Sequence, residues 1–361
     1  MKITSVAIQG YCHRLLAPLR LSSGVISERQ GVMIRILADN GMVGYGEAAP
    51  LPGFSPETLE ATTKILGQIE SAWQGKTVPA SLDEISNMVR QVIPAGYPAA
   101  VFGLETALGD LAAQASGRPL ALWLNAKAAR EVPVNYLITG TKPDQDTTAA
   151  DFERGKYAVT KIKVGHRSEE DDIAFVRGLV DLLGGNITLR LDANRQWTYD
   201  TAVRVLNGLR QYGIEYVEEP LDNPLPAQLI RLKAETGIRI ALDETPAELG
   251  GVEAWLSSAA VDVLIIKPTI IGGIARAVQL KETAQRYNRS VVVTSTFESN
   301  IGLMALVHLA AAISPGTACG LDTRSLFNTG IISLQLSVKN GAIAVPEKPG
   351  LGLDARVWET I

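Results

Sequence analysis

The first fifty residues alternate between apolar and polar positions, which is typical of strands with one buried face. Strands are predicted over residues 1–9, 31–39 and 41–47. Asn40-Gly41 between the last two is a dipeptide typical of tight hairpin turns. Residues 55–115 have a helical pattern instead, with capping residues in Ser55-Pro-Glu-Thr58 and a run rich in Ala and Leu over 99–115. We therefore expect an antiparallel sheet with helices, an α+β unit, at the N-terminus.

From about residue 130 the pattern changes to short apolar runs, rich in β-branched residues, that alternate with helical segments. The runs cover 132–138, 160–164, 187–192, 215–218, 238–243, 263–267, 291–294 and 318–321, and helical patterns include 168–183, 198–212 and 274–287. Polar residues at the run ends recur every 24 to 29 residues, the length of one strand and helix. Eight such runs predict a closed β/α barrel. A doubly wound open sheet is the alternative, but no glycine-rich phosphate loop follows any run.

The change of pattern divides the chain into two domains and a tail. We expect an α+β domain over 1–100 and a barrel domain over 101–324. The tail, 325–361, contains a second hairpin dipeptide, Asn340-Gly341, and is predicted to return to the N-terminal domain.

Composition narrows the class of protein. The 361 residues carry 34 Lys and Arg against 38 Asp and Glu, so no basic excess favours a nucleic-acid partner. Cys12 and Cys319 are too few for a disulfide framework and suit a reducing compartment. No signal-like stretch or apolar run of membrane-spanning length occurs. We expect a cytoplasmic protein without membrane insertion; the sequence does not indicate an oligomeric state.

Acidic residues end three consecutive predicted strands, as Asp192, Glu218 and Asp243. In a β/α barrel these positions meet at one end, where the carboxylates would repel one another unless a cation lay between them. Oxygen-only ligands select a hard ion, Mg²⁺ first and Mn²⁺ second. The alternative, that each acid caps the next helix, is less favoured for three matched positions. Strand parity separates Glu218 from Glu219 only weakly.

Lysines lie on both sides of this acidic group. Lys161 and Lys163 share one face of their strand, and Lys267 ends a later strand. This is the layout of two bases around a metal-bound oxyanion, and nearby positive charge and burial would lower a lysine pKa toward the value that a base needs. Salt bridges between lysines and carboxylates are the alternative interpretation.

Other polar motifs give weaker signals. Gly272-Gly273 is equally consistent with an anion-binding turn at a helix N-terminus and with an ordinary strand-to-helix turn. His13, His166 and His308 lack metal-ligand spacing, and His308 lies in an apolar run that predicts a core position. Neither cysteine has a neighbouring base in the sequence.

Five motifs carry a resemblance to a known family. They are Lys161-Ile-Lys163, Leu191-Asp-Ala-Asn194, Val217-Glu-Glu-Pro220, Leu242-Asp-Glu-Thr245 and Ile266-Lys-Pro268. In this order and spacing, over nearly the whole chain, the sequence resembles the enolase superfamily and its muconate-lactonizing subgroup. The resemblance implies an α/β fold in which an N-terminal α+β capping domain, completed by the C-terminal tail, lies on a (β/α)₇β TIM-like barrel.

Within the subgroup, segments 44–58, 189–197, 294–299 and 320–323 are similar to o-succinylbenzoate synthases. That similarity implies Mg²⁺-dependent syn-dehydration of a small carboxylate, 2-succinyl-6-hydroxy-2,4-cyclohexadiene-1-carboxylate, in menaquinone or phylloquinone synthesis. Dipeptide epimerases share the metal and lysine motifs but carry Asp-x-Asp on the last strand, where this chain has Gly320-Leu321-Asp322. N-succinylamino acid racemases remain an alternative, since one active site can catalyse both reactions.

The resemblance also implies roles for individual residues. Lys163 would remove the proton α to the carboxylate and then protonate the departing hydroxyl, while Lys267 stabilises the intermediate from the opposite face. Lys161 would hold Lys163 neutral. Substrate contacts are expected from Arg190 to the succinyl carboxylate, from Asn194, from backbone N–H groups at Thr294 and Ser295, and from Glu298 at the rim. A cap loop near residues 19–29 would close over the ring.

Overall fold

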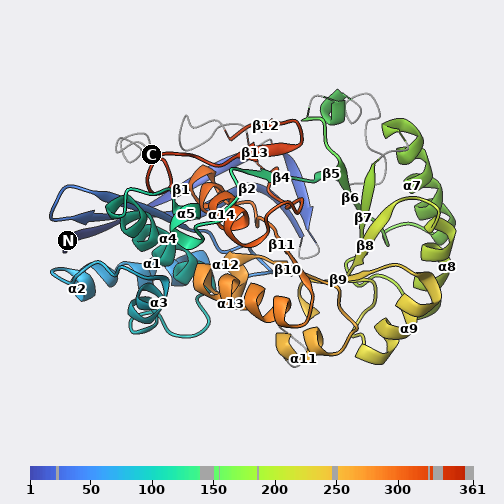
Figure 1. Cartoon of the computed structure of the whole chain (residues 1–361), viewed down its shortest axis with the longest axis horizontal. Coiled ribbons are helices and arrows are strands. Elements are labelled where there is room, and N and C mark those ends of the chain that lie inside the picture. Colours follow the sequence, from blue (N-terminus) through green and yellow to red (C-terminus); the bar gives the residue numbers. More distant parts are fainter. Residues whose placement is uncertain are drawn as a thin grey trace.

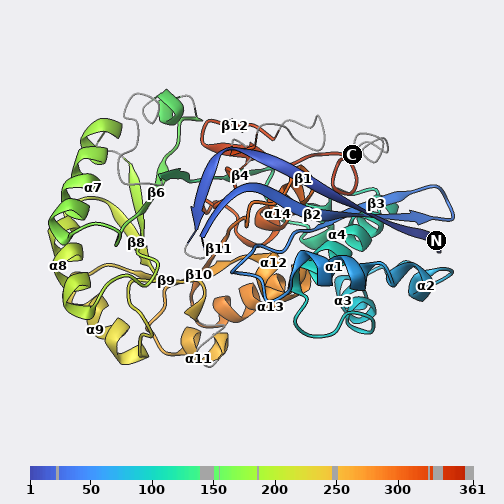
Figure 2. The same ribbon diagram turned by 180° about the vertical axis from the view of Figure 1, so that it is seen from behind.

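A computed structural model of the chain describes residues 1–21, 24–138, 150–153, 155–184, 187–245, 251–323, 326–327 and 336–353. They form an antiparallel sheet with helices on one side of the molecule and a curled parallel sheet, ringed by helices, on the other (Figures 1 and 2). The (β/α)₇β barrel with an N-terminal α+β unit is therefore confirmed.

The N-terminal sheet has the order β1-β2-β3, with β1 at Ile3–Leu21, β2 at Gly24–Ala38 and β3 at Val43–Ala48. The first two strands are longer than predicted, and their far end extends toward the barrel (Figure 2). Most residues there are exposed, so no single buried face imposes the alternation by which a strand is predicted. A register shift between Arg14 and Leu19 marks a bulge in β1.

Four helices cover this sheet: α1 at Leu59–Leu66, α2 at Ile69–Trp73, α3 at Leu82–Arg90 and α4 at Pro98–Ala115. Nearly all of α4 is buried, because it packs against β3 and also against helices of the barrel. Glycines allow its close approach, since a Cβ at Gly46 would lie 1.9 Å from the carbonyl oxygen of Gly103. One helix thus joins the two halves of the molecule.

The parallel sheet has the order β5-β6-β7-β8-β9-β10-β11. These strands lie at Tyr136–Ile138, Val159–Lys163, Thr188–Asp192, Ile214–Glu218, Ile240–Leu242, Val263–Ile266 and Ser290–Val293, and β4, at Glu131–Pro133, precedes them. The predicted eighth run closes the barrel by parallel bridges that pair Cys319 with Val134 and Gly320 with Thr294. All eight predicted runs therefore take part in it.

Helices surround the barrel on its outer side (Figure 1). They are α5 at Leu120–Leu124, α7 at Glu169–Leu183, α8 at Tyr199–Leu209, α9 at Pro226–Thr236, α11 at Val252–Ser257, α12 at Pro268–Ile271, α13 at Gly273–Arg286 and α14 at Asn300–Ile313. Ser168 and Thr198 accept backbone N–H groups at the starts of α7 and α8, as their places before the helical patterns predict. No helix within the described ranges is long and apolar enough to cross a membrane.

The tail contacts both halves. Its hairpin of β12, Val338–Lys339, and β13, Ala342–Ala344, turns at Asn340-Gly341 and pairs with β4. Phe327 forms a bridge with Leu15 of β1. Residues 324, 325, 328–335 and 354–361 lie outside the described residues, and the domain limits at 100 and 324 stay a prediction.

Candidate active site

A cavity of about 550 Å³ lies at the end of the barrel where the strands finish. Barrel residues of strands β5 to β11 and of the closing segment line it, and Pro18, Leu19, Leu51 and Phe54 of the N-terminal unit cover it. The predicted cap loop near 19–29 thus places its first residue in the cavity lining. We call Leu51 and Phe54 the roof.

Strand register puts the predicted groups at one level. Lys163 pairs with Asp192 and Asp192 with Glu218 across β6, β7 and β8, so the three side chains share one face and one height. Lys161, Arg190 and Tyr216 form the next layer down in the same register. Residues of both layers, among them Lys161 and Lys163 of the same strand, line the cavity.

Lysines and carboxylates are paired at short distances. Lys161 Nζ lies 2.8 Å from Asp192 Oδ2 and 2.7 Å from Glu218 Oε2. Lys163 Nζ lies 2.6 Å from Asp192 Oδ2 and donates to Asn194 Oδ1 at 2.6 Å. Asn194 therefore orients the amine of Lys163 from within the cavity lining.

Lys267 follows β10 and approaches from another side. Its Nζ donates to Asp243 and lies 3.7 Å from Glu244 Oε1. The amine also lies 5.7 Å from the centre of the Phe54 ring, a cation–π contact with the roof. Sequence reasoning missed Glu244, although it directly follows Asp243.

The charges of the site are unevenly compensated. Burial raises the pKa of Glu218 to about 7, and the nearby charge of Asp192 adds to this despite Lys161. Burial likewise raises the pKa of Asp243 to about 6 in spite of Lys267. Asp192 has the opposite balance, because Lys161 and Lys163 outweigh its burial and hold its pKa well below the usual range. Burial thus outweighs the nearby lysines at Glu218 and Asp243, whereas the lysines outweigh burial at Asp192.

The expected lowering of lysine pKa values is wrong for Lys161 and Lys267. Burial disfavours the ammonium form of Lys161, but Asp192 and Glu218 outweigh it and raise the pKa well above its usual value. Asp243 and Glu244 likewise outweigh burial and raise the pKa of Lys267. The salt-bridge interpretation therefore describes these lysines, because the carboxylates are nearer to them than any other cation is.

The donor set fits a hard divalent cation. Asp192, Glu218 and Asp243 would supply oxygen ligands alone, which is the donor type that Mg²⁺ prefers. Across the residues that the structure describes, no three potential ligands converge at metal-binding distance. Lys161 lies between Asp192 and Glu218, so its amine would have to give way to an ion.

Glu219 has a different environment from Glu218. Its carboxylate accepts the backbone N–H groups of Asp243 and Thr245, at 2.8 and 2.9 Å, and pairs with Arg195 at 3.2 Å. Glu218 lines the cavity, whereas Glu219 fixes the loop that carries Asp243. The structure thereby separates two residues that strand parity could not.

Arg190 does not line the cavity, which corrects its expected contact with the substrate. Only 1% of the side chain is exposed. Its guanidinium pairs with Glu215 at 2.7 Å, donates to the carbonyl oxygen of Ala318 at 2.6 Å and stacks on the Tyr216 ring. Arg190 is in register with Lys161 and Tyr216, which do line the cavity, so its contacts with Glu215 and Ala318, and not its level, keep it in the barrel interior. No sequence pattern pointed to Tyr216.

The segment after β11 also differs from expectation. The N–H groups of Thr294 and Ser295 donate to the carbonyl oxygens of Ile266 and Gly320, both at 2.9 Å. These groups therefore already take part in the hydrogen bonds between barrel strands. Their side chains line the cavity with Thr296 and Phe297, and we call Thr294–Phe297 the cavity wall. Glu298 is 1% exposed and lies behind this wall rather than at the rim.

Two weaker signals find explanations in packing. The Gly272-Gly273 turn does lie beside an acidic group, but this group is the side chain of Glu105, whose Oε2 accepts the N–H of Ala275 at 2.9 Å. His308 is fully buried and its Nδ1 accepts the N–H of Ala121 at 3.1 Å. His166, by contrast, lines the cavity, and Asp322 of the closing segment lines the cavity as well.

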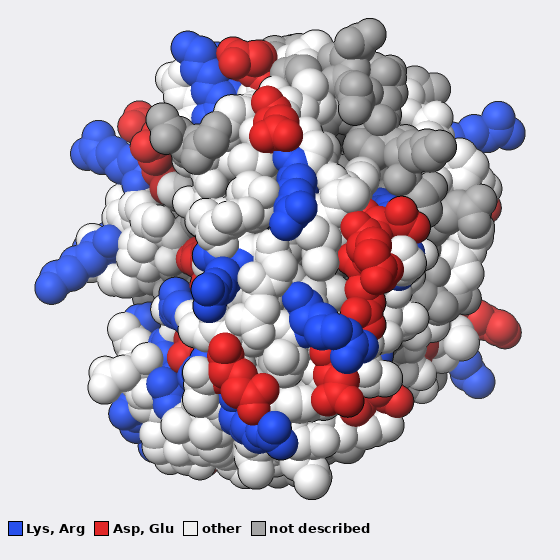
Figure 3. Space-filling model, turned by 90° about the vertical axis from the view of Figure 1, so that its right-hand side faces the viewer, with Lys and Arg blue, Asp and Glu red and all other residues white. Residues whose placement is uncertain are grey.

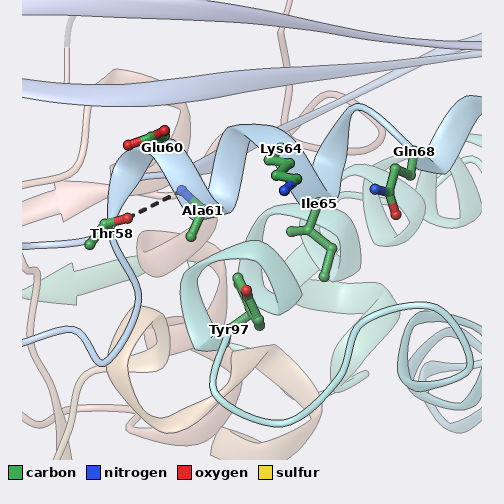
Figure 4. Close-up of a pocket in the computed structure, with 7 residues that line it drawn as sticks. All are labelled: Thr58, Glu60, Ala61, Lys64, Ile65, Gln68 and Tyr97. Carbon is green, nitrogen blue, oxygen red and sulfur yellow. Dashed lines mark hydrogen bonds between the residues drawn. The ribbon is translucent and has the colours of Figure 1, made fainter.

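Features outside this cavity give weaker evidence of a function. A hollow beside α1, shown in Figure 4, is lined by Thr58, Glu60, Ala61, Lys64, Ile65, Gln68 and Tyr97. Thr58 there accepts the N–H of Ala61 at 3.2 Å as the helix cap, which is a structural role. Figure 3 shows charges of both signs interspersed on the side of α7, α8 and α9.

Comparison with known proteins decides the family. Residues 145–359, more than half of the chain, match the model described as enolase C-terminal domain-like, and residues 4–111 match the MenC N-terminal domain. The chain belongs to the enolase superfamily. The predicted family is thus confirmed, and this is a superfamily of enzymes.

Relatives within the superfamily have different activities. An o-succinylbenzoate synthase of Aliivibrio salmonicida is 34% identical over 86% of this chain and 89% of its own. A D-Ala-D/L-Ala epimerase of Cytophaga hutchinsonii is 30% identical over 98% of this chain and 95% of its own. A solved dipeptide epimerase of Enterococcus faecalis, complexed with Mg and the dipeptide L-Leu-L-Tyr, is 27% identical, with a TM-score of 0.88 over 98% of this chain and 99% of that one.

Proposed function

We propose that this enolase superfamily member is an o-succinylbenzoate synthase. It would dehydrate 2-succinyl-6-hydroxy-2,4-cyclohexadiene-1-carboxylate to o-succinylbenzoate with Mg²⁺, in the cytoplasm, as a step of menaquinone or phylloquinone synthesis. Support comes from the 34% identity to a synthase and from the match to the MenC N-terminal domain.

The observation that carries this choice is Gly320. Dipeptide epimerases of the subgroup carry an Asp-x-Asp motif on the last strand that holds a substrate amine, and this chain has Gly320-Leu321-Asp322 there, with Gly320 in place of the first Asp. A Cβ at Gly320 would lie 3.0 Å from both Cγ2 and Oγ1 of Thr294, tighter than nine in ten real Cβ contacts, so a side chain here would require Thr294 to shift by a few tenths of an ångström. Gly320 itself supplies no carboxylate to hold a substrate amine, which favours a substrate without one.

The chemistry requires removal of a weakly acidic proton. A proton α to a carboxylate is difficult to remove because the carbanion adds a second negative charge to that group. Mg²⁺, held by Asp192, Glu218 and Asp243, would neutralise these carboxylates and supply Lewis-acid stabilisation of the ene-diolate. The remaining chemistry belongs to the amines of the cavity.

Lys163 is the base in this proposal. Its amine lies in the cavity lining and is oriented by Asn194, at 2.6 Å. It removes the α-proton and, as an ammonium, returns a proton to the departing hydroxyl on the same face, which gives syn elimination. Lys267 stabilises the negative charge from its own side of the cavity, and Lys161 supplies positive charge beneath Asp192.

A second candidate is 1,1-proton transfer on an N-acyl amino acid or a dipeptide. Asp322 favours it, because this carboxylate faces the cavity and accepts a hydrogen bond from Tyr157. Lysines on separate strands would serve such a racemisation as two bases.

Comparison of kcat/KM for the hydroxycyclohexadiene acid, an N-succinylamino acid and a dipeptide separates the candidates. The dehydration substrate should be preferred by at least about tenfold, which corresponds to 1.4 kcal/mol. Faster exchange of solvent deuterium into the N-succinylamino acid or the dipeptide would assign the second function instead.

A further inference from the structure

Two buried glutamate side chains from different halves of the molecule lie beside the first turn of α14. A Cβ at Gly302 would lie 2.9 Å from Glu47 Oε2 and 2.7 Å from Glu298 Cβ. Glu47 belongs to β3 of the N-terminal sheet, and Glu298 precedes α14 in the barrel. Both are buried, with 0% and 1% exposure.

Glu47 connects the N-terminal hairpin to α14. Its Oε1 accepts the hydroxyl of Tyr11 on β1 at 2.5 Å and the N–H of Ser299 at 2.7 Å. Its Oε2 accepts the hydroxyl of Ser299 and the N–H of Gly302, the latter at 2.8 Å. The carboxylate thus caps a barrel helix and is held by a strand of the other unit.

Glu298 connects the cavity wall to α12, the short helix that follows Lys267. Its Oε2 accepts the hydroxyl of Ser295 at 2.5 Å and the N–H of Thr296 at 2.8 Å. Its Oε1 accepts the hydroxyl of Thr269, which lies two residues after Lys267. One buried carboxylate therefore sets the position of the wall relative to the strand end that carries a catalytic amine.

Arg29 provides a second connection between the same parts. Its guanidinium donates to the carbonyl oxygens of Ala49 and Pro50, directly before the roof residue Leu51. It also donates to the carbonyl oxygen of Thr296 in the wall, at 3.4 Å. Arg29 thus ties the segment before the roof directly to the wall, and Glu47 ties β3, which leads into the roof, to Ser299, two residues after the wall.

We propose that Glu47 and Glu298 are paired positioning residues, which set the roof and Lys267 against the same cavity wall. Neither lines the cavity, so both act through their hydrogen-bond partners: Glu47 sets how the roof closes on the substrate, and Glu298 sets where Lys267 lies. The kinetic part of this inference rests on the proposed function, whereas the coupling of roof and wall does not.

Glu105 offers a matched control. It is also a fully buried carboxylate of the N-terminal unit that caps a barrel helix, through the N–H of Ala275. Neither Glu105 nor Ala275 lines the cavity. Loss of helix capping alone should therefore look the same in Glu105→Gln and Glu47→Gln, and loss of positioning should not.

The test combines four single variants and two double variants with two measurements. Tyr11→Phe removes the donor from the hairpin side and leaves the donors of α14 in place, so this variant should fold even if Glu47→Gln does not. Glu47→Gln, Glu298→Gln and Glu105→Gln complete the set. Kinetics gives kcat and KM for the hydroxycyclohexadiene acid, and hydrogen exchange followed by mass spectrometry reports on segments 49–54 and 294–302.

We expect Tyr11→Phe and Glu47→Gln to raise KM at least fivefold and to speed exchange in both segments. Glu298→Gln should lower kcat at least tenfold. The double variant Glu47→Gln/Glu298→Gln should lose less kcat/KM than the product of the single losses, whereas Glu105→Gln/Glu298→Gln should lose that product. Glu105→Gln alone should leave kcat and KM within twofold.

Two results would overturn the inference. One is that Tyr11→Phe leaves exchange in 294–302 and KM unchanged; the other is that Glu47→Gln shows the kinetics of Glu105→Gln. If the unaltered protein does not turn over the dehydration substrate, the proposed function fails. Exchange in the Tyr11→Phe variant then still decides whether roof and wall are coupled.

Discussion

Lys163 Nζ lies 2.6 Å from Asp192 Oδ2, so the proposed base and a proposed metal ligand are in direct contact. The contact follows from strand register, because the two residues are paired across β6 and β7. An ion bound by Asp192 would accordingly lie beside the amine, with the carboxylate of the substrate near both.

Replacement of Lys163 tests the base. Lys163→Ala should lower kcat by about 10³-fold, since general base catalysis typically contributes 10²- to 10⁴-fold. The melting temperature should change little, because the side chain is partly exposed. Lys64→Ala, at an exposed position of α1, is the control and should keep full activity. Near-normal turnover of Lys163→Ala would exclude it as the base.

Replacement of Glu218 tests the metal site. Glu218→Gln removes one negative charge from the proposed ligands. We expect Mg²⁺ affinity to fall at least about tenfold, because loss of a residue that only orients a metal ligand already costs that much. Calorimetric titration measures this independently of turnover. Glu219→Gln should disturb the Asp243 loop through its backbone contacts and so lower stability as well. Unchanged Mg²⁺ affinity in Glu218→Gln would remove it from the ligand set.

Gly320 tests the choice of substrate. Gly320→Asp should displace Thr294 from the wall and lower dehydration at least about tenfold, the cost of roughly 1.4 kcal/mol. It should not create efficient dipeptide epimerisation. Gly178→Ala, where a Cβ meets nothing within 4 Å, is the control and should be kinetically silent. Normal dehydration by Gly320→Asp would show that the wall does not select the substrate.

Arg190 separates stability from substrate binding. Arg190→Met removes hydrogen bonds to Glu215 and to the carbonyl oxygen of Ala318, and it should lower the free energy of unfolding by about 2 kcal/mol. KM should rise less than threefold, since the guanidinium does not line the cavity. Urea unfolding and steady-state kinetics measure the two effects. A large rise in KM with unchanged stability would restore Arg190 as a substrate ligand.

Glu105 makes stability depend on pH. Burial raises its pKa from 4.5 to about 7, so the folded state binds this proton more tightly than the unfolded state does. Its contribution to stability is complete below pH 4.5 and is lost as the pH rises through 7, by about 3 kcal/mol. The free energy of unfolding, measured with urea between pH 5 and pH 8, should therefore decline less with rising pH in Glu105→Gln than in the unaltered protein. An equal decline in both proteins would contradict this origin.

The barrel could be predicted because its strands are buried on both faces and end in polar residues at regular intervals. Lys161, Asp192 and Lys267 were found in this way, and the structure places all three at one cavity. The ends of β1 and β2 could not be predicted, because that hairpin is exposed and its pattern reflects no single core.

The contacts that each polar side chain makes were the main limit for predicting the site. Arg190 and Asp192 share a face, yet Arg190 lies in the barrel interior and Asp192 in the cavity, because Arg190 pairs with Glu215 and the carbonyl oxygen of Ala318. Contacts between residues far apart in the chain could not be predicted either, since nothing in the sequence connects Glu47 with Ser299. The pKa values of Lys161 and Lys267 could not be predicted, because they depend on how near each amine lies to carboxylates that other strands carry.

The most direct test of the proposed function is formation of o-succinylbenzoate by the unaltered protein, followed by its ultraviolet absorbance. We expect turnover with Mg²⁺, its loss in excess EDTA and its return when Mg²⁺ is added back. Absence of product under all three conditions, or turnover that EDTA leaves unchanged, would contradict a metal-assisted dehydration at this cavity.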